Sequence, residues 1–598
     1  MPEAAPTSSE PNVAAEPSSD NSWLVRHGEI GAALAVFVTT AAATVAMMPP
    51  SRYPELVYVF AAPAVFWAYR APAWKLYLWT LFAAQAVAWT ITLSWLHHVT
   101  WAGLLLLGPV VGAWVGCWFV AARWTMPKLK GLPWPRRVLA VLGLAGAWVV
   151  IEWTRAWVLS GFPWLTLSAT QWERLSVLQP AAYTGAWGVS FVLIAVNVAF
   201  AAYAWKLLGA LWSPGAPAPE AAGSRTRCPE FIAAMVLLLG CLMLTARDTF
   251  NRARFHRFWA SVGIVQPAIP QAVKWDPAEA RGILDTLEEE TRKVAASEPD
   301  LLLWPEATTP LATKGDSGMQ DWTERLARRA GRPLLLGSVA YEGGGEEGSR
   351  WWNGVFLATP QGGLAPEFYA KRHLVPFGEY VPMRPVLGWL EKVVPVGGDF
   401  DVGAGPGLIT LPLGKGWSER EDASRAGALI CYEDIFPSLA RESVAAGAEV
   451  LIVQTNNGWF GEGAAAYQHA AHSVLRAVET RRPVLRAGNS GWSGWIDECG
   501  AIRAVLAKDP ETGAVRTEPT ERGSAAKGAG TVYFRGGATL AVTRDARFLG
   551  VQTLYVRWGD WFVAVSAVLA ALAWATLRKP YQAPAVSKHT SLRGTTES

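Results

Sequence analysis

The stretch Gly427-Ala-Leu-Ile-Cys-Tyr-Glu-Asp434 begins with small and apolar residues and continues directly into a cysteine. A short apolar run of this kind, bounded by turn signals, is typical of a buried strand. In open α/β sheets, ligands and reacting groups gather beyond the carboxyl ends of the strands. The stretch therefore predicts a strand of an α/β sheet that delivers Cys431 to such an edge.

Two further motifs bring polar side chains to predicted strand ends. Leu301-Leu-Leu-Trp-Pro-Glu306 is an apolar strand followed by a carboxylate. The stretch Tyr369-Ala-Lys-Arg-His-Leu-Val-Pro-Phe-Gly-Glu-Tyr-Val-Pro382 carries Lys371 and Glu379. Together with the cysteine, these motifs supply a base, a cation and a sulfur nucleophile. Thiol chemistry on an acyl group needs a base to form the thiolate and a donor to stabilise the oxyanion.

Each of these residues also has a purely structural interpretation. A cysteine after a strand is commonly a buried small residue without reactivity. Glu306 alone could cap the following helix, and Lys371 alone could be a solvated charge. The catalytic interpretation therefore depends on all three side chains meeting in the folded protein.

Strand-like and helix-like segments alternate around these motifs. The apolar β-rich runs are 258–266, 301–304, 333–340, 353–358, 426–431, 450–455 and 484–487. The helical patterns are 277–297, 319–331, 437–447 and 464–482. This alternation predicts an α/β domain whose sheets are covered by helices. The Gly- and charge-rich stretches 343–350 and 414–427 predict surface loops.

The remainder of the chain is much more apolar. Of all residues, 51% are hydrophobic and 17% are charged, and the 33 tryptophans cluster in the apolar half, where indole suits a membrane interface. A bilayer-spanning helix needs about 20 predominantly apolar residues. The predicted spans are 30–48, 54–70, 76–96, 102–122, 137–158, 184–205, 230–247 and 560–577. The second of them is short and contains Pro63.

The chain is thus expected to be a membrane α-helical bundle of about eight transmembrane helices joined to an α/β domain. Its expected segments are a disordered tail 1–22, a transmembrane domain 23–248 of about seven helices, an α/β domain 249–559, a final transmembrane helix 560–577 and a tail 578–598. The first tail is rich in Pro, Ser, Ala and Glu, which cannot bury a core, and it lacks the basic region of a signal peptide.

Basic residues in short loops predict the orientation, because they favour the cytoplasmic side. They gather after the second, fourth and sixth spans and in the C-terminal tail, as Arg70, Lys75, Lys128, Lys130, Arg136, Arg137, Lys206, Arg225, Arg227, Arg578, Lys579, Lys588 and Arg593. The alternate loops carry only Arg52 and Arg174. Both termini are therefore expected in the cytoplasm, and segment 249–559 is expected in the periplasm.

Several function classes are disfavoured by the sequence. A net charge of +4 and the absence of a Lys/Arg block with interleaved aromatic residues argue against nucleic-acid binding. The five cysteines form no C-x-x-C pair, so a disulfide framework is not indicated. His469 and His472 lie three residues apart with no third ligand nearby, which predicts helix-face histidines and no metal site. No cofactor is expected.

The order of the three polar motifs resembles the nitrilase or carbon–nitrogen hydrolase superfamily, through Trp-Pro-Glu306, Lys371-x-x-Leu-Val-Pro-Phe-Gly-Glu and Cys431-Tyr-Glu. That superfamily has an αββα sandwich fold and a Glu–Lys–Cys triad. The fuller pattern is similar to its membrane branch, the apolipoprotein N-acyltransferase family, and the similarity covers nearly the whole chain. The additional matching segments are 265–276, 455–461, 152–155, 161–164 and 185–191, which leads to Asn197.

The resemblance implies roles for individual residues. Cys431 would be the nucleophile, Glu306 the general base, and Lys371 an oxyanion stabiliser together with backbone N–H groups. Glu379 would orient groups or relay a proton, and a further pair, Tyr432 and Glu433, would shape the pocket.

Trp275 has two open interpretations. It would line the lipid entrance if the resemblance extends to its loop, or it would simply anchor the domain at the membrane interface. Glu152 and Arg155, at a span end, are expected to form a helix-end polar network, because charges there are costly unless paired.

The sequence departs from the family pattern at three places. It has Asn456-Asn457 where Asn-Asp is common, Pro267-Ala268 where Gly-Asn is usual, and Arg486-Ala-Gly-Asn-Ser-Gly-Trp492 as a variant segment. None of these changes falls on the three proposed catalytic residues.

The implied reaction moves an acyl chain from a membrane phospholipid, expected to be phosphatidylethanolamine, to Cys431. The free α-amino group of an S-diacylglyceryl cysteine on an apolipoprotein then takes the chain from the thioester. One alternative is a membrane-anchored amidase or nitrilase with water as the acceptor. Another is a non-catalytic membrane scaffold or transporter, against which the near absence of charges at the midplane of the spans argues.

Overall fold

The computed structural model describes residues 19–209, 228–250, 252–343, 349–382, 384–388, 399–413, 424–518 and 530–578. The predicted tails fall outside these ranges, except that residues 19–22 begin helix α1 (Ser19–Ala46) and Arg578 ends helix α15 (Trp561–Arg578). Residues 344–348 and 414–423 of the two predicted surface loops also lie outside the described residues.

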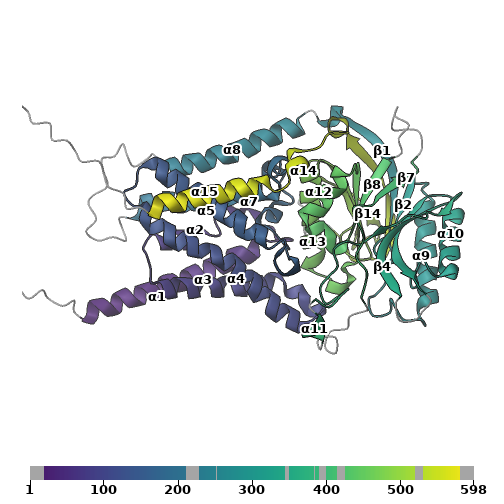
Figure 1. Ribbon diagram of the computed structural model, residues 1–598, viewed down its shortest axis with the longest axis horizontal. Helices are drawn as coiled ribbons and strands as arrows, with labels where there is room; N and C mark the ends of the chain where they lie inside the picture. The colour runs from purple at the N-terminus through teal and green to yellow at the C-terminus, as the bar shows by residue number, and fades with distance from the viewer. Residues whose placement is uncertain are drawn as a thin grey trace, which may run out of the picture.

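The protein consists of a helical bundle at one end and an α/β domain at the other (Figure 1). Within the described residues, six helices are long and apolar enough to cross a membrane. They span Gly28–Ala46, Trp101–Leu129, Trp134–Thr154, Ala186–Leu208, Pro229–Arg254 and Trp561–Arg578. These six correspond to predicted spans, so the prediction of a membrane bundle is confirmed.

The other two predicted spans differ from one another. The span predicted at 76–96 is a single 19-residue helix, α3 (Trp74–Thr92). The span predicted at 54–70 is instead a short 3₁₀ turn, η1 (Pro54–Tyr58), followed by a short helix, α2 (Ala62–Ala68). The count of about eight is therefore approximate, because this segment is not one continuous helix.

The break between η1 and α2 has a clear physical reason. Pro63 lacks a backbone N–H, so it is tolerated in the first turn of a helix but not in its interior. The side chain of Asn197, on α7 (Ala186–Leu208), satisfies the freed backbone by accepting from Ala61 N at 2.9 Å and donating to Val57 O at 2.6 Å. Non-helical backbone inside a membrane protein is tolerated where such partners exist.

The C-terminal helix joins the bundle through close packing of small residues. Helix α15 lies against α5 (Trp134–Thr154). A Cβ atom added at Gly146 would lie 2.3 Å from Ser566 O, and one added at Gly143 would lie 2.3 Å from Ala573 Cβ. Glycine is needed at both positions, because small residues let transmembrane helices approach closely.

The α/β domain contains two sheets. The first has the order β15-β1-β2-β3-β4-β5, with β6 (Tyr369–Ala370) also paired to β4. Its strands are β1 (His256–Gln266), β2 (Leu301–Leu303), β3 (Leu334–Glu342), β4 (Arg350–Thr359), β5 (Gly363–Leu364) and β15 (Gly536–Asp545). Strands β1, β2 and β3 run parallel.

The second sheet has the order β12-β11-β10-β9-β8-β7. Its strands are β7 (Leu408–Leu411), β8 (Ser424–Ile430), β9 (Val450–Thr455), β10 (Val484–Gly488), β11 (Gly494–Ile496) and β12 (Ile502–Val505). Strands β8, β9 and β10 run parallel, so their carboxyl ends lie at one edge.

Apolar side chains from both sheets form one core between them, with Leu303 and Val355 from the first sheet and Ile430 and Ile452 from the second. Helices α9 (Ala280–Ala295) and α10 (Ser317–Ala330) cover the outer face of the first sheet. Helices α12 (Pro437–Ala445) and α13 (Ala464–Thr480) cover the outer face of the second. The predicted αββα sandwich is confirmed (Figure 1).

Helix α13 also packs on the membrane bundle, because its apolar residues share one core with bundle residues. The indole N–H groups of Trp95 and Trp164 both donate to Gln468 Oε1 at 2.9 Å. The backbone N–H of Leu165 donates to His472 Nε2 at 3.0 Å. Helix α13 thus lies between the second sheet and the bundle, and its contacts hold the two together.

Candidate active site

Three strand ends converge at the candidate site. Glu306 follows β2, Lys371 directly follows β6, and Cys431 directly follows β8. Lys371 Nζ lies 3.3 Å from Glu306 Oε1, and the charge of Glu306 acts on the Cys431 thiol. The structure therefore brings the three side chains together from both sheets of the sandwich.

Cys431 occupies a strained position at the start of the turn η10 (Cys431–Ile435). Its φ is +49°, in the left-handed region that few non-glycine residues adopt. Its carbonyl oxygen lies 3.1 Å from His469 Nε2 on α13. Such strain persists only where the surroundings impose it, and it is common at functional sites.

Glu306 is a buried carboxylate with several partners. Asn353 Nδ2, from β4, donates to Oε1 at 2.8 Å, and the backbone N–H of Asn456 donates to Oε2 at 3.0 Å. Burial alone would raise the pKa of Glu306, but the ammonium groups of Lys371 and Lys274 hold it below its usual value. Glu306 is thus an anion beside a thiol.

Lys371 lies between two carboxylates. Its Nζ is 2.8 Å from Glu379 Oε1 and 3.3 Å from Glu306 Oε1, and its side chain is fully buried. Burial would lower its pKa, but the two carboxylates outweigh burial and raise it. Lys371 therefore remains charged. Glu379 also accepts hydrogen bonds from Asn353 Nδ2 and Val375 N, so it fixes the orientation of its neighbours.

Glu433 connects the lysine segment to the cysteine segment. Its carboxylate accepts from Arg372 N at 2.6 Å, His373 N at 3.1 Å and Ile430 N at 2.7 Å. It also accepts from the Tyr369 hydroxyl, at 2.9 and 2.8 Å to its two oxygens. Glu433 therefore fixes the backbone next to Lys371 and the backbone next to Cys431.

The two remaining predicted residues face different surroundings. The hydroxyl of Tyr432 donates to Gly161 O, at 2.8 Å, in a loop of the membrane bundle. Trp275 is 49% exposed, in the loop between β1 and α9.

The thiol of Cys431 stays protonated in this resting arrangement. Burial and the negative charge of Glu306 raise its pKa to about 12. Because the thiolate is the nucleophilic form, attack on an acyl group requires transfer of the proton to a nearby base. Glu306 is the carboxylate whose charge acts on the thiol, and Lys371 is a cation beside it. The arrangement can therefore perform thiol-mediated acyl transfer.

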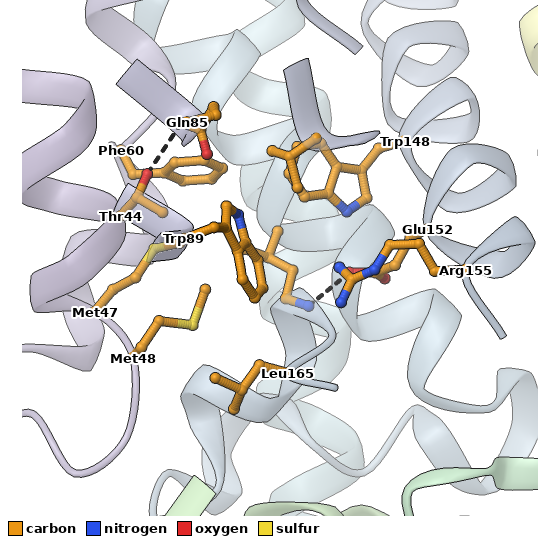
Figure 2. A pocket seen from close by; sticks show the side chains of 12 residues that line it. Thr44, Met47, Met48, Phe60, Gln85, Trp89, Trp148, Glu152, Arg155 and Leu165 are labelled. Atoms are coloured by element: carbon orange, nitrogen blue, oxygen red, sulfur yellow. Dashed lines mark hydrogen bonds between the residues drawn. The ribbon is translucent and has the colours of Figure 1, made fainter. Parts of the chain in front are cut away.

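A second polar cluster lies inside the membrane bundle, where Glu152 and Arg155 line a small cavity (Figure 2). Glu152 Oε1 accepts from Leu167 N at 2.6 Å, and Arg155 donates to Trp164 O. The cavity volume of about 10 Å³ has room for about one water molecule, far too little for an acyl chain. The contacts match a polar network that fixes the loop after α5.

Sequence reasoning missed several residues of the site. Asn353 donates hydrogen bonds to the carboxylates of Glu306 and Glu379. Its only sequence signal was that a polar residue lies within an apolar strand. Asn456 and Lys274 lie in segments that resemble the family, but no role followed from their spacing. Histidines 469 and 472 bind protein groups, and within the described ranges no set of His, Cys, Asp or Glu is arranged to hold a metal.

Residues 261–518 match the family model for carbon–nitrogen hydrolases, and residues 40–199 match that for the apolipoprotein N-acyltransferase N-terminal domain. An apolipoprotein N-acyltransferase from Geobacter metallireducens is 34% identical over 434 residues, which cover 71% of this chain and 73% of the relative. One from Gloeobacter violaceus is 29% identical over 551 residues, covering 89% and 91%.

Among solved structures, an amidase from Nesterenkonia sp. is similar to this chain with 20% identity and a TM-score of 0.30. The similarity covers 42% of this chain and 86% of the amidase. The match to the relative from Geobacter metallireducens, over more than two thirds of both chains, decides the family. The chain belongs to the apolipoprotein N-acyltransferase family.

Proposed function

We propose that this N-acyltransferase moves an acyl chain from a membrane phospholipid to a lipoprotein through a thioester on Cys431. The observation that carries the proposal is the convergence of one buried thiol, one carboxylate and one ammonium at strand ends of the two sheets. Family membership supports a lipoprotein as the acceptor. A membrane lipid donor fits a catalytic domain joined to apolar helices, six of which, in the described part of the chain, are long enough to cross a membrane.

In the first step, Glu306 takes the thiol proton as Cys431 Sγ attacks the ester carbonyl of the phospholipid. The carbon–sulfur bond forms, and Lys371 stabilises the negative charge on the carbonyl oxygen. The ester carbon–oxygen bond then breaks, and the departing alcohol takes the proton from Glu306. The products are a lysophospholipid and an acyl-enzyme. We propose phosphatidylethanolamine as the donor.

In the second step, the free α-amino group of an S-diacylglyceryl cysteine attacks the thioester. Glu306 takes a proton from the amine, the carbon–sulfur bond breaks, and the thiolate recovers the proton. The product is an N-acylated lipoprotein, and the enzyme returns to its starting state. Glu379 and Glu433 would serve both steps by holding Lys371 and the Cys431 turn in place.

The proposed orientation places the α/β domain in the periplasm of a bacterium and both termini in the cytoplasm. The two described chain ends, in α1 and α15, lie at the end of the bundle far from the α/β domain (Figure 1). That arrangement fits an even number of crossings, and the basic loops favour the cytoplasm for the ends.

Acyl transfer and hydrolysis differ in the acceptor of the acyl group, which is an amine in the first case and water in the second. A diacylated lipopeptide with a free N-terminal amine should gain one acyl chain when it is incubated with the protein and phospholipid. The same lipopeptide with an acetylated amine should gain none, because no nucleophile remains. Mass spectrometry of both lipopeptides measures the result. Free fatty acid as the main product, in the presence of the free-amine lipopeptide, would instead favour a membrane-anchored amidase.

A further inference from the structure

A second lysine lies beside the proposed catalytic residues. Lys274, in the loop between β1 and α9, is only 3% exposed. Its Nζ donates to the backbone carbonyl of Glu306 at 3.4 Å. Burying an ammonium group is costly unless it is paired, so its position needs a compensating interaction. Neither step of the proposed reaction uses this side chain.

The charges around the site explain what Lys274 adds. Glu306 and Glu379 both contact Lys371, so the contact cluster has two carboxylates and one ammonium. Lys274 is the second cation, and its charge acts on Glu306 and on Cys431. With Lys274 charged and the thiol protonated, the two carboxylates and the two ammonium groups have a net charge of zero. Without it, they would carry one negative charge beside the thiol.

We propose that Lys274 is a positioning residue whose charge balances the second carboxylate and whose hydrogen bond fixes the turn that presents Glu306. This inference rests on the proposed function of Cys431 and Glu306. The groups facing Lys274 are Glu306 from the loop after β2 and Cys431 from the end of β8. Lys371 contacts Glu306 and Glu379, and among the described residues it forms no hydrogen bond or ion pair with Lys274.

The charge of Lys274 should favour the first step by keeping Glu306 ionised. Burial alone would raise the pKa of Glu306, and a protonated carboxyl group could not accept the thiol proton. An opposite charge within a few ångströms typically shifts the pKa of a neighbouring ionisable group by about 1–3 units. Such a shift changes the ionisation constant of that group by about tenfold or more. Because Lys274 adjoins Trp275, the same residue also ties the exposed indole to the turn that holds Glu306.

The effect of the Lys274 charge can be measured through the pH dependence of the acylation rate. Burial lowers the pKa of Lys274 to about 8, although the negative charge of Glu306 opposes the shift. Lys274 is therefore protonated below this pKa and neutral above it. The acylation rate of wild-type protein should lose the contribution of this charge as the pH rises through about 8, because Lys274 becomes neutral. A variant without the charge should not show this loss.

The test measures how fast an acyl adduct forms on Cys431 when the protein is mixed with phosphatidylethanolamine vesicles without acceptor. Lys274→Met keeps the length of the side chain and removes its charge. Below the pKa of Lys274, the wild-type rate should exceed the Lys274→Met rate by about tenfold or more. Above this pKa, the ratio should fall toward one, because wild type has lost the same charge.

Three further variants complete the design. Lys274→Arg keeps a charge at high pH, so its advantage over Lys274→Met should persist above the pKa of Lys274. Lys274→Gln is a second uncharged variant, in case Lys274→Met does not fold. Lys293→Met is the matched control: Lys293 lies on α9 with its side chain 51% exposed and pairs with Glu289 and Glu290. Its rate should equal the wild-type rate at every pH.

Two outcomes would overturn the inference about Lys274. One is a ratio of wild type to Lys274→Met that is large but independent of pH, which indicates a purely structural role. The other is a ratio of one throughout. In both cases an adduct that still maps to Cys431 leaves the proposed function intact. An adduct that maps to another residue contradicts the proposed function itself.

Discussion

At Glu306, a buried carboxylate keeps its charge because two lysine ammonium groups and two neutral donors surround it. Glu306→Gln preserves the shape of the side chain but cannot accept a proton. Acylation of Cys431 by phospholipid should therefore slow by about 10²–10⁴-fold, the usual contribution of a general base. Mass spectrometry over a time course measures this rate.

The control for that substitution is Glu289→Gln on α9, whose side chain is 58% exposed. It should acylate at the wild-type rate. If Glu306→Gln also acylates at the wild-type rate while remaining folded, another group must take the thiol proton.

Asn457 gives a second prediction at the scale of one residue. Its Oδ1 lies 3.1 Å from His469 Nδ1, and Asp434 lies 2.8 Å from His469 Nε2. Burial and Arg486 lower the pKa of His469 from its usual 6.5, so its protonation opposes folding. Stability that depends on the neutral ring is therefore lost as the pH falls below 6.5.

Asn457→Asp would put a second carboxylate on this ring and raise the pKa of His469. The variant should then lose less stability than wild type when the pH is lowered through 6.5. Thermal unfolding of both proteins over this pH range checks the difference. Parallel curves for the two proteins would mean that His469 does not titrate with folding.

The residue types of the site were predictable to different degrees. Glu306, Lys371 and Cys431 were singled out as polar residues at predicted strand ends, and their roles followed from the family resemblance, without any contact information. Asn353 and Lys274 lie in the middle of a strand and a loop, where sequence gives no sign of what they face. Their roles depend on contacts between segments that are distant in the chain, such as Asn353 with Glu306.

At the scale of elements, the packing of α5 on α15 depends on glycines. Gly146→Val would drive a methyl group into the backbone of Ser566, because even a Cβ would lie 2.3 Å from its carbonyl oxygen. The helices would have to separate, and overpacking of this kind costs about 1–3 kcal/mol. The thermal midpoint of the detergent-solubilised protein should therefore fall.

Gly240→Val on α8 (Pro229–Thr249) is the matched control, because a Cβ there has no atom within 4 Å. It introduces the same residue into a helix of similar composition. Equal midpoints for Gly146→Val and Gly240→Val would show that close approach of α5 and α15 does not stabilise the bundle.

Most elements were predictable from sequence, and the exception has a physical cause. Long apolar runs give helices because the backbone must satisfy its own hydrogen bonds in lipid. The run 54–70 satisfies part of its backbone through Asn197, which lies more than a hundred residues away in the chain. No local pattern could reveal that partner, so hydropathy alone predicted a single helix there.

At the scale of the whole molecule, the orientation is open to a direct test. A cytoplasmic reporter fused after Arg227 should be active, and a periplasmic reporter fused after Thr512 should be active. The reciprocal fusions should be inactive, because the basic loops predict that residue 227 lies in the cytoplasm. Cytoplasmic activity of the fusion after Thr512 would reverse the proposed orientation and contradict a lipoprotein acceptor.

The measurement that tests the central claim most directly is the mass of the intact protein after incubation with phospholipid alone. A two-step transfer passes through an acyl-enzyme that accumulates without acceptor. We predict a gain of one acyl group, removable by hydroxylamine and mapping to Cys431. Cys431→Ala should show no gain, whereas Cys228→Ala and Cys499→Ala, which replace other buried cysteines, should acylate normally. An adduct that persists in Cys431→Ala, or that maps to Cys499, would contradict the account.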